Sequence, residues 1–139
     1  MLEQSELLII KSELTNDPLS LGLTVLPADD EANANLLNEV RDTILVYRAS
    51  VPSDEILIPI DEWNALSAGQ QSWWNNQTQD GSIKPAVIAS EFAKMFGAET
   101  QSRANWDAVT KEPSSRVIQL FERYVYITPS DIANARNAV

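Results

Sequence analysis

Helix start signals recur at short intervals along this 139-residue chain, and they limit it to short helices. TPSD (128–131) has the form of a helix N-terminus, with a threonine cap, a proline in the first turn and an acid three residues after the cap. Pro85 opens another helix, and Ser67 and Thr100 can cap two more. Because a break follows each start within a few turns, the sequence predicts several short helices rather than one long bundle.

Apolar periodicity and these breaks together predict most of the secondary structure. Helices are expected over residues 3–15, about 29–41, 52–66 with a break at Pro59, 67–77, 84–96, 100–110, from 113 onward, and 129–138. The apolar but irregular residues 18–27 are predicted to form a loop that packs on the core. Two β-branched and aromatic runs, 43–48 and 124–127, are the strand candidates.

These patterns predict a mainly α protein, a compact multi-helix domain of about six to seven short helices. The two strand candidates could pair as a small two-stranded β-ribbon, 43–48 with 124–127, because a similar helix start follows each of them. The length lies in the usual range of one domain, and 44% of the residues are hydrophobic, enough for one sizeable core. We therefore predict a single helical domain over residues 1–139.

The chain has no cysteine and no histidine. Disulfides and thiolate chemistry are excluded, as are the commonest general base and the commonest zinc ligand. The longest apolar run, residues 7–10, is too short to span a bilayer, and we expect no secretory signal. The sequence predicts no cofactor, no membrane partner and no small-molecule substrate.

Acidic pairs allow two chemical interpretations. Asp61 and Glu62, with Asp54 and Glu55 before them, could form a catalytic carboxylate pair beside tryptophan platforms, as glycoside hydrolysis requires. Paired acids at a helix start are more often surface residues that suit the helix dipole, so we do not predict an enzyme. The acids of residues 29–31 lack the alternating spacing of a calcium-binding loop, and no metal site is predicted.

Charge is unevenly distributed along the sequence. Residues 1–80 carry 14 acids and 3 bases, whereas residues 81–139 carry 6 acids and 7 bases. This asymmetry favours a molecule with an acidic face and a nearly neutral one, which suits head-to-tail stacking; a solvated surface with chance unevenness is the alternative. Clustered Lys and Arg are missing, which argues against direct, sequence-specific binding of nucleic acid.

The stretch 61–77 holds three of the four tryptophans, Trp63, Trp73 and Trp74. Trp63 has the spacing of a core residue. Trp73 and Trp74 are adjacent on one expected helix and must point about 100° apart, so at most one of them can lie at the centre of the core. The other is a candidate interface residue; alternatively, both are partly buried under the loop 18–27.

Four arginines are spread over the last third of the chain, at positions 103, 116, 123 and 136. They could meet the acidic part of a neighbouring copy, or they could pair within the chain. The predicted partner interface consists of Trp73, Trp74, Arg116, Arg123 and Arg136.

Three stretches resemble, in order and spacing, small acidic helical proteins encoded among the structural genes of tailed bacteriophages. They are KSELTNDPLSLGL (11–23), DEWNALSAGQQSWW (61–74) and SRVIQLFERYVYITPSDIANAR (115–136). The resemblance implies a virion structural protein of the head–tail region, of the connector or neck type, which forms an oligomeric ring with copies of itself and other virion proteins. It also implies assembly in the host cytoplasm, and it carries over no catalytic residue.

The chain lacks the long extended arm with which many neck proteins clamp their neighbours, so other virion positions stay open. A monomeric acidic binding module, or an inhibitor that mimics the charge of nucleic acid, is the alternative function.

Overall fold

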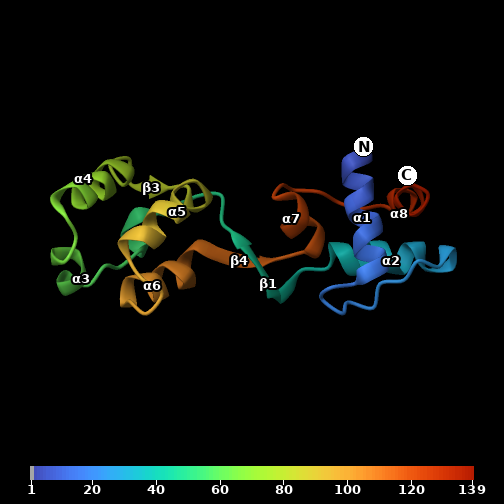
Figure 1. Cartoon of the computed structure of the whole chain (residues 1–139), viewed down its shortest axis with the longest axis horizontal. Helices are drawn as coiled ribbons and strands as arrows, with labels where there is room; N and C mark the ends of the chain where they lie inside the picture. Colours follow the sequence, from blue (N-terminus) through green and yellow to red (C-terminus); the bar gives the residue numbers. More distant parts are fainter. Residues whose placement is uncertain (1) are drawn as a thin grey trace. The chain divides into compact units, whose positions relative to one another are not determined.

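The computed structural model describes residues 2–139, and these form two compact units (Figure 1). Unit 1 combines the chain up to Val46 with Pro113–Val139, whereas unit 2 is the continuous segment Tyr47–Glu112. Each unit has its own cluster of buried apolar residues, and the two clusters share no residue.

Unit 1 is a group of four helices built from both ends of the sequence. Its helices are α1 (Gln4–Asn16), α2 (Asp30–Asn38), α7 (Arg116–Phe121) and α8 (Pro129–Arg136), with a 3-10 turn, η1, at Pro27–Asp29. Helix α8 packs against α1 and α2, and α7 packs against α2. The chain ends both lie in this unit (Figure 1). Its core includes Ile10, Leu14, Leu37, Val117, Ile127 and Ile132.

Unit 2 contains the other four helices. They are α3 (Ile60–Asn64), α4 (Ala68–Gln77), α5 (Pro85–Met95) and α6 (Gln101–Thr110), preceded by a 3-10 turn, η2, at Ser53–Glu55. Two short strands, β2 (Val51–Pro52) and β3 (Ser82–Ile83), pair antiparallel with Val51 opposite Ile83. Aromatic rings dominate the core, where Phe92 stacks on Trp106 with ring centroids 4.2 Å apart.

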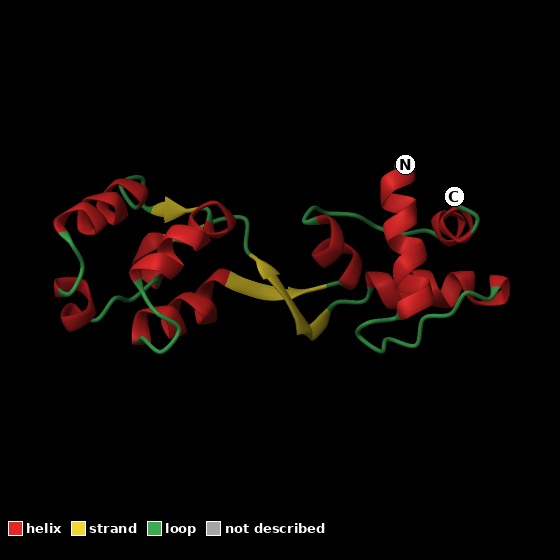
Figure 2. Ribbon diagram, viewed as in Figure 1, coloured by secondary structure: helices red, strands yellow, loops and turns green. Residues whose placement is uncertain are grey.

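Two strands carry the chain between the units. The chain leaves unit 1 in β1 (Arg41–Tyr47) and returns in β4 (Lys111–Ser114), and these strands are hydrogen-bonded neighbours in one two-stranded sheet (Figure 2).

The mainly α fold class is confirmed. Eight α-helices occur within residues 2–139, one more than the upper number predicted. The predicted caps also form: the Ser67 hydroxyl accepts a hydrogen bond from the amide of Gln70, and the Thr128 hydroxyl accepts one from the amide of Asp131. None of these eight helices combines the length and the apolar character that crossing a membrane requires.

The predicted partner of the first strand was wrong. Strand β1 pairs with β4 at residues 111–114, and not with 124–127; a helix had been expected from residue 113 onward. Residues 124–127 form no strand, because Val125 and Ile127 pack into the helical core of unit 1 and the side chain of Asn38 takes both backbone groups of Ile127.

The buried apolar residues form two clusters, whereas the hydrophobic fraction suggested one sizeable core. The physical reason is that the residues around Phe92 collect apolar partners from their own part of the chain, between Val51 and Trp106. The apolar residues of both chain ends then form a separate cluster around Leu37 and Ile132.

Candidate partner-binding surface

Arg116, a predicted interface residue, is engaged inside unit 1. Its guanidinium donates two parallel hydrogen bonds to the carboxylate of Glu13, from Nε to Oε2 at 2.9 Å and from Nη2 to Oε1 at 2.6 Å. The third nitrogen donates to Gln119 Oε1 at 2.6 Å. The side chains of Arg116 and Glu13 are only 14% and 8% exposed. The pair is therefore a buried structural link between α7 and α1.

Arg123 and Arg136 also pair within unit 1. Arg123 bonds to Glu6 on α1, and Arg136 bonds to Asp30 at the start of α2. The hydrogen bond from Arg123, assisted by one from the amide of Glu3, lowers the pKa of Glu6. These arginines therefore pair with acids of the same chain, which is one of the two possibilities that the sequence left open. The side chain of Arg123 is nevertheless half exposed. A partner contact through these arginines stays a prediction.

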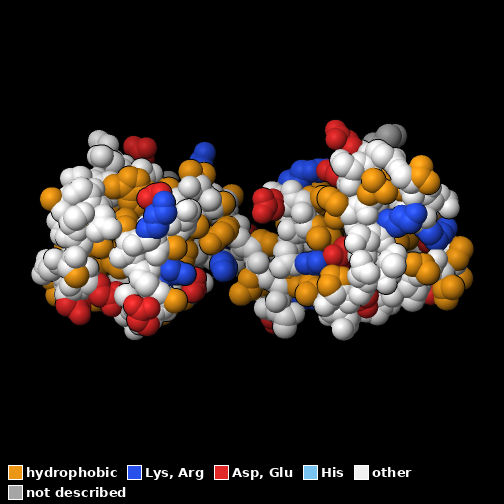
Figure 3. Space-filling model, viewed as in Figure 1, with side chains coloured by type: hydrophobic (Ala, Val, Ile, Leu, Met, Phe, Trp, Pro, Cys, Tyr) orange, Lys and Arg blue, Asp and Glu red, His pale blue; other side chains and the backbone are white. Residues whose placement is uncertain are grey.

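The charge asymmetry of the sequence does not carry over to the two units, because unit 1 contains both ends of the chain. Each of the three ion pairs joins an arginine of the last third to an acid of the first 30 residues. Unit 1 carries 11 acids and 5 bases, and unit 2 carries 9 acids and 5 bases. On the face shown in Figure 3, acidic and basic side chains lie near one another in each unit. Neither unit is the nearly neutral end that the sequence suggested.

The tryptophans all lie in unit 2, where they serve its core to different degrees. Trp74 is buried against Phe92 with ring centroids 5.5 Å apart, whereas Trp73 is partly buried and tilts by 40° to Trp74. The prediction that only one of this adjacent pair reaches the centre is confirmed. Trp63, expected as a core residue, is partly buried at the edge of the same cluster.

Glu62, one of the acids of the candidate carboxylate pair, binds the N-terminus of α6. Its Oε1 accepts from the hydroxyl of Ser102 at 2.6 Å and from the amide at 2.8 Å, and its Oε2 accepts from the amide of Gln101 at 3.0 Å. The hydroxyl and amide of Ser102, and then the amide of Gln101, lower the pKa of Glu62. This carboxylate acts as a helix cap supplied from a distant part of the chain.

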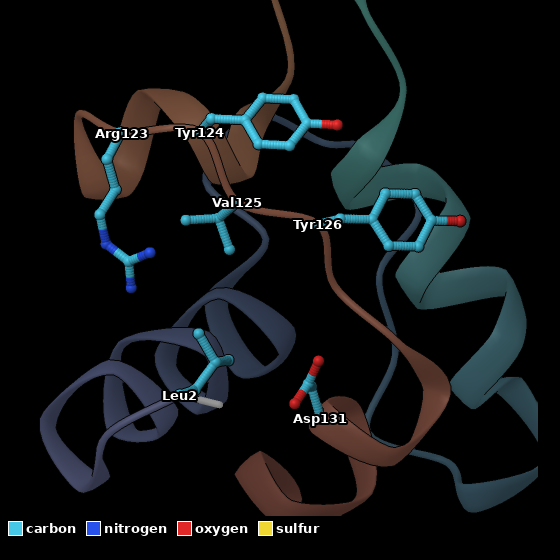
Figure 4. A pocket seen from close by; sticks show the side chains of 6 residues that line it. All are labelled: Leu2, Arg123, Tyr124, Val125, Tyr126 and Asp131. Carbon is cyan, nitrogen blue, oxygen red and sulfur yellow. The ribbon is translucent and has the colours of Figure 1, made fainter.

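Exposed aromatic side chains gather on the segment between α7 and α8. Tyr124 is 83% exposed and Tyr126 is 65% exposed, whereas Val125 and Ile127 are buried. The alternation is that of a half-buried strand. Figure 4 shows the two tyrosine rings extending to the same side of the backbone.

A pocket of about 220 Å³ adjoins these tyrosines. We call the pocket and its rim the tyrosine surface; it consists of Leu2, Arg123, Tyr124, Val125, Tyr126 and Asp131. In Figure 4 the Asp131 carboxylate and the Leu2 side chain lie on the opposite side of the pocket from the backbone of Tyr124. The surface combines two exposed aromatic rings, an apolar wall and one carboxylate.

Sequence reasoning identified the run 124–127 but missed the residue that fixes it. Asn38, on α2, donates to the carbonyl of Ile127 at 2.7 Å and accepts from its amide at 2.8 Å. Asn33 holds both backbone groups of Thr24 in the same manner. The period-two pattern of YVYI signals a half-buried segment, but no local pattern marks an asparagine as its partner.

No group of three or more acidic side chains that could hold a metal ion occurs in the described chain. Comparisons with protein-family models, with curated proteins and with solved structures find no match.

Proposed function

We propose that this chain is a virion structural protein of a tailed bacteriophage, placed in the head–tail region, which acts through protein–protein contacts in an oligomeric ring. The observation that carries the proposal is the tyrosine surface, where Tyr124 and Tyr126 are exposed beside a pocket. The resemblance of residues 11–23, 61–74 and 115–136 to phage structural proteins supports the particular setting.

Tyrosine is among the residues enriched at protein interfaces, because it offers a large apolar ring with a polar end. A stable interface buries about 800 Å² on each partner, so the tyrosine surface serves as the centre of a larger contact. Arg123 stands beside the rings with a half-exposed side chain, and arginine is likewise enriched among residues that dominate binding. No reacting group is needed for this role.

Mass spectrometry of purified particles tests the setting. We expect the chain in particles at a fixed copy number, and its absence from them would remove the virion proposal. Assembly is tested by co-purification of the particle with Tyr124→Ala, Tyr126→Ala and Val87→Ala proteins. Val87 is a matched control because it is 75% exposed and belongs to unit 2. Incorporation should fall for both tyrosine variants and stay normal for the control.

A second candidate function is that of a monomeric acidic binding module, which binds a basic protein in place of nucleic acid. The net charges of −6 for unit 1 and −4 for unit 2 favour it, because both units repel acidic partners and attract basic ones. The test is binding to a basic DNA-binding protein at rising salt. Affinity that vanishes at high salt, together with a monomer in light scattering, selects this candidate.

A further inference from the structure

The backbone of the tyrosine surface is open to pairing. Among residues 2–139, the backbone amides and carbonyls of Tyr124, Val125 and Tyr126 make no hydrogen bond, whereas both groups of Ile127 bond to Asn38. Unpaired backbone groups in a strand-like segment are a template for another strand. An extended peptide laid beside this segment would meet backbone groups that have no partner within the described part of unit 1.

The pocket beside this segment has a free acidic acceptor. Asp131 Oδ2 accepts from the amide and the hydroxyl of Thr128, both at 2.9 Å. Within the described residues, Asp131 Oδ1 accepts no hydrogen bond, and Figure 4 shows this carboxyl group facing the space between Leu2 and Tyr126. A cation in this space would find a carboxylate oxygen beside the apolar side chains of Leu2 and Val125.

Arg123, the basic residue of the tyrosine surface, already has an acidic partner. The Arg123 guanidinium bonds to Glu6, so that its charge is offset inside unit 1. With unit 1 at a net charge of −6, the long-range field also favours a basic partner over an acidic one. The apolar side chains of Leu2 and Val125 line the pocket and can receive the methylene stem of a long basic side chain.

We propose that the tyrosine surface binds an extended, basic segment of another protein. The segment pairs with the backbone of Tyr124–Tyr126 and inserts a lysine or arginine side chain into the pocket toward Asp131. This inference rests on the proposed function for its biological setting, and it adds the chemistry of the partner.

The test uses the full ¹⁵N-labelled chain and three synthetic hexapeptides, each acetylated and amidated. The first alternates threonine and valine around a central lysine; the second has norleucine in place of lysine; the third keeps lysine but carries N-methyl groups on alternate amides. Amide chemical shifts of residues 123–127 and 131 report binding. The lysine peptide should give saturable shifts there at about millimolar concentration, the range expected of a short weak ligand.

The basic side chain and the main-chain pairing should each contribute to the affinity of the lysine peptide. The norleucine peptide should bind about tenfold more weakly, the effect of one charge-assisted hydrogen bond. The N-methylated peptide should also bind about tenfold more weakly, because it cannot complete the ladder. Equal affinity for the lysine and norleucine peptides, or no saturable shift with any peptide, overturns the proposal.

Protein variants locate the site. Tyr126→Ala should weaken binding of the lysine peptide, while Val87→Ala should bind like the unaltered chain. Asp131→Asn keeps an acceptor for the helix cap and should bind the lysine and norleucine peptides alike. If Asp131→Asn unfolds, the norleucine comparison still decides the matter on the unaltered chain. Presence in particles without peptide binding refutes this inference alone, and peptide binding without presence in particles refutes only the virion setting.

Discussion

The buried pair of Arg116 and Glu13 permits the sharpest test of what holds unit 1 together. Replacing Arg116 by methionine keeps most of the apolar stem and removes the guanidinium. Glu13, whose side chain is 8% exposed in the unaltered chain, then loses its bidentate partner, and Gln119 loses its donor. Removing one member of a buried ion pair costs about 3–5 kcal/mol, because the remaining charge is left uncompensated.

The lower end of this range applies here. Arg116 is 14% exposed, so that water can reach Glu13 once the guanidinium is gone. We therefore expect Arg116→Met to lower the free energy of unfolding by about 3 kcal/mol, equivalent to a fall in Tm on the order of 10 °C. The double variant Arg116→Met with Glu13→Gln should recover at least half of the loss, because no charge is then buried alone.

Circular dichroism during urea and thermal unfolding measures both variants. Tryptophan fluorescence adds a readout confined to unit 2, because all four tryptophans lie there. Arg41→Met is a matched control, since that guanidinium bonds to the exposed carboxylate of Glu39, and it should cost less than about 1 kcal/mol. A loss below 1 kcal/mol for Arg116→Met, or a double variant as unstable as the single one, would refute this account of the pair.

Three other predictions follow from single contacts. Trp74→Ala should destabilise unit 2 by about 3–5 kcal/mol in urea unfolding, and Trp73→Ala by roughly half as much, because Trp74 is buried and Trp73 is only partly buried. Equal losses for the two variants would contradict this. The bonds from Ser102 hold the pKa of Glu62 below its ordinary 4.5, so its contribution is present above pH 4.5 and is lost as the pH falls through the lowered value; Glu62→Gln should flatten this acid limb of unfolding measured against pH. Asn38→Ala should cost about 1–3 kcal/mol for each backbone group left unpaired, with accelerated amide hydrogen exchange over 124–128; unchanged exchange there would show that another group replaces the amide.

Local features of the fold could be predicted because short-range chemistry decides them. The caps at Ser67 and Thr128 each involve a partner three residues away, and both helices begin where the sequence indicates. The divergence of Trp73 and Trp74 follows in the same way from helix geometry alone.

Features set by distant partners could not be predicted. Glu62 finds the amide of Ser102 across 40 positions, and Arg116 finds Glu13 across 103. Nothing in the residues around either member specifies the other. The same holds for β1, whose period and composition indicate a strand but do not distinguish residues 111–114 from 124–127 as its partner.

Unit 1 is the more demanding part of the molecule to assemble, because its two segments are separated by the whole of unit 2. Closing so long a loop costs entropy before any contact forms. The pairing of β1 with β4 offsets part of this cost by fixing the two crossings of the chain beside one another. The ion pairs of Arg116, Arg123 and Arg136 then join the C-terminal segment to α1 and α2. Since the tyrosine surface is carried on that segment, a change at Arg116 will disturb it through folding. Tyr124 and Tyr126 take part in none of these ion pairs, so variants of these two residues measure the role of the tyrosine surface in binding.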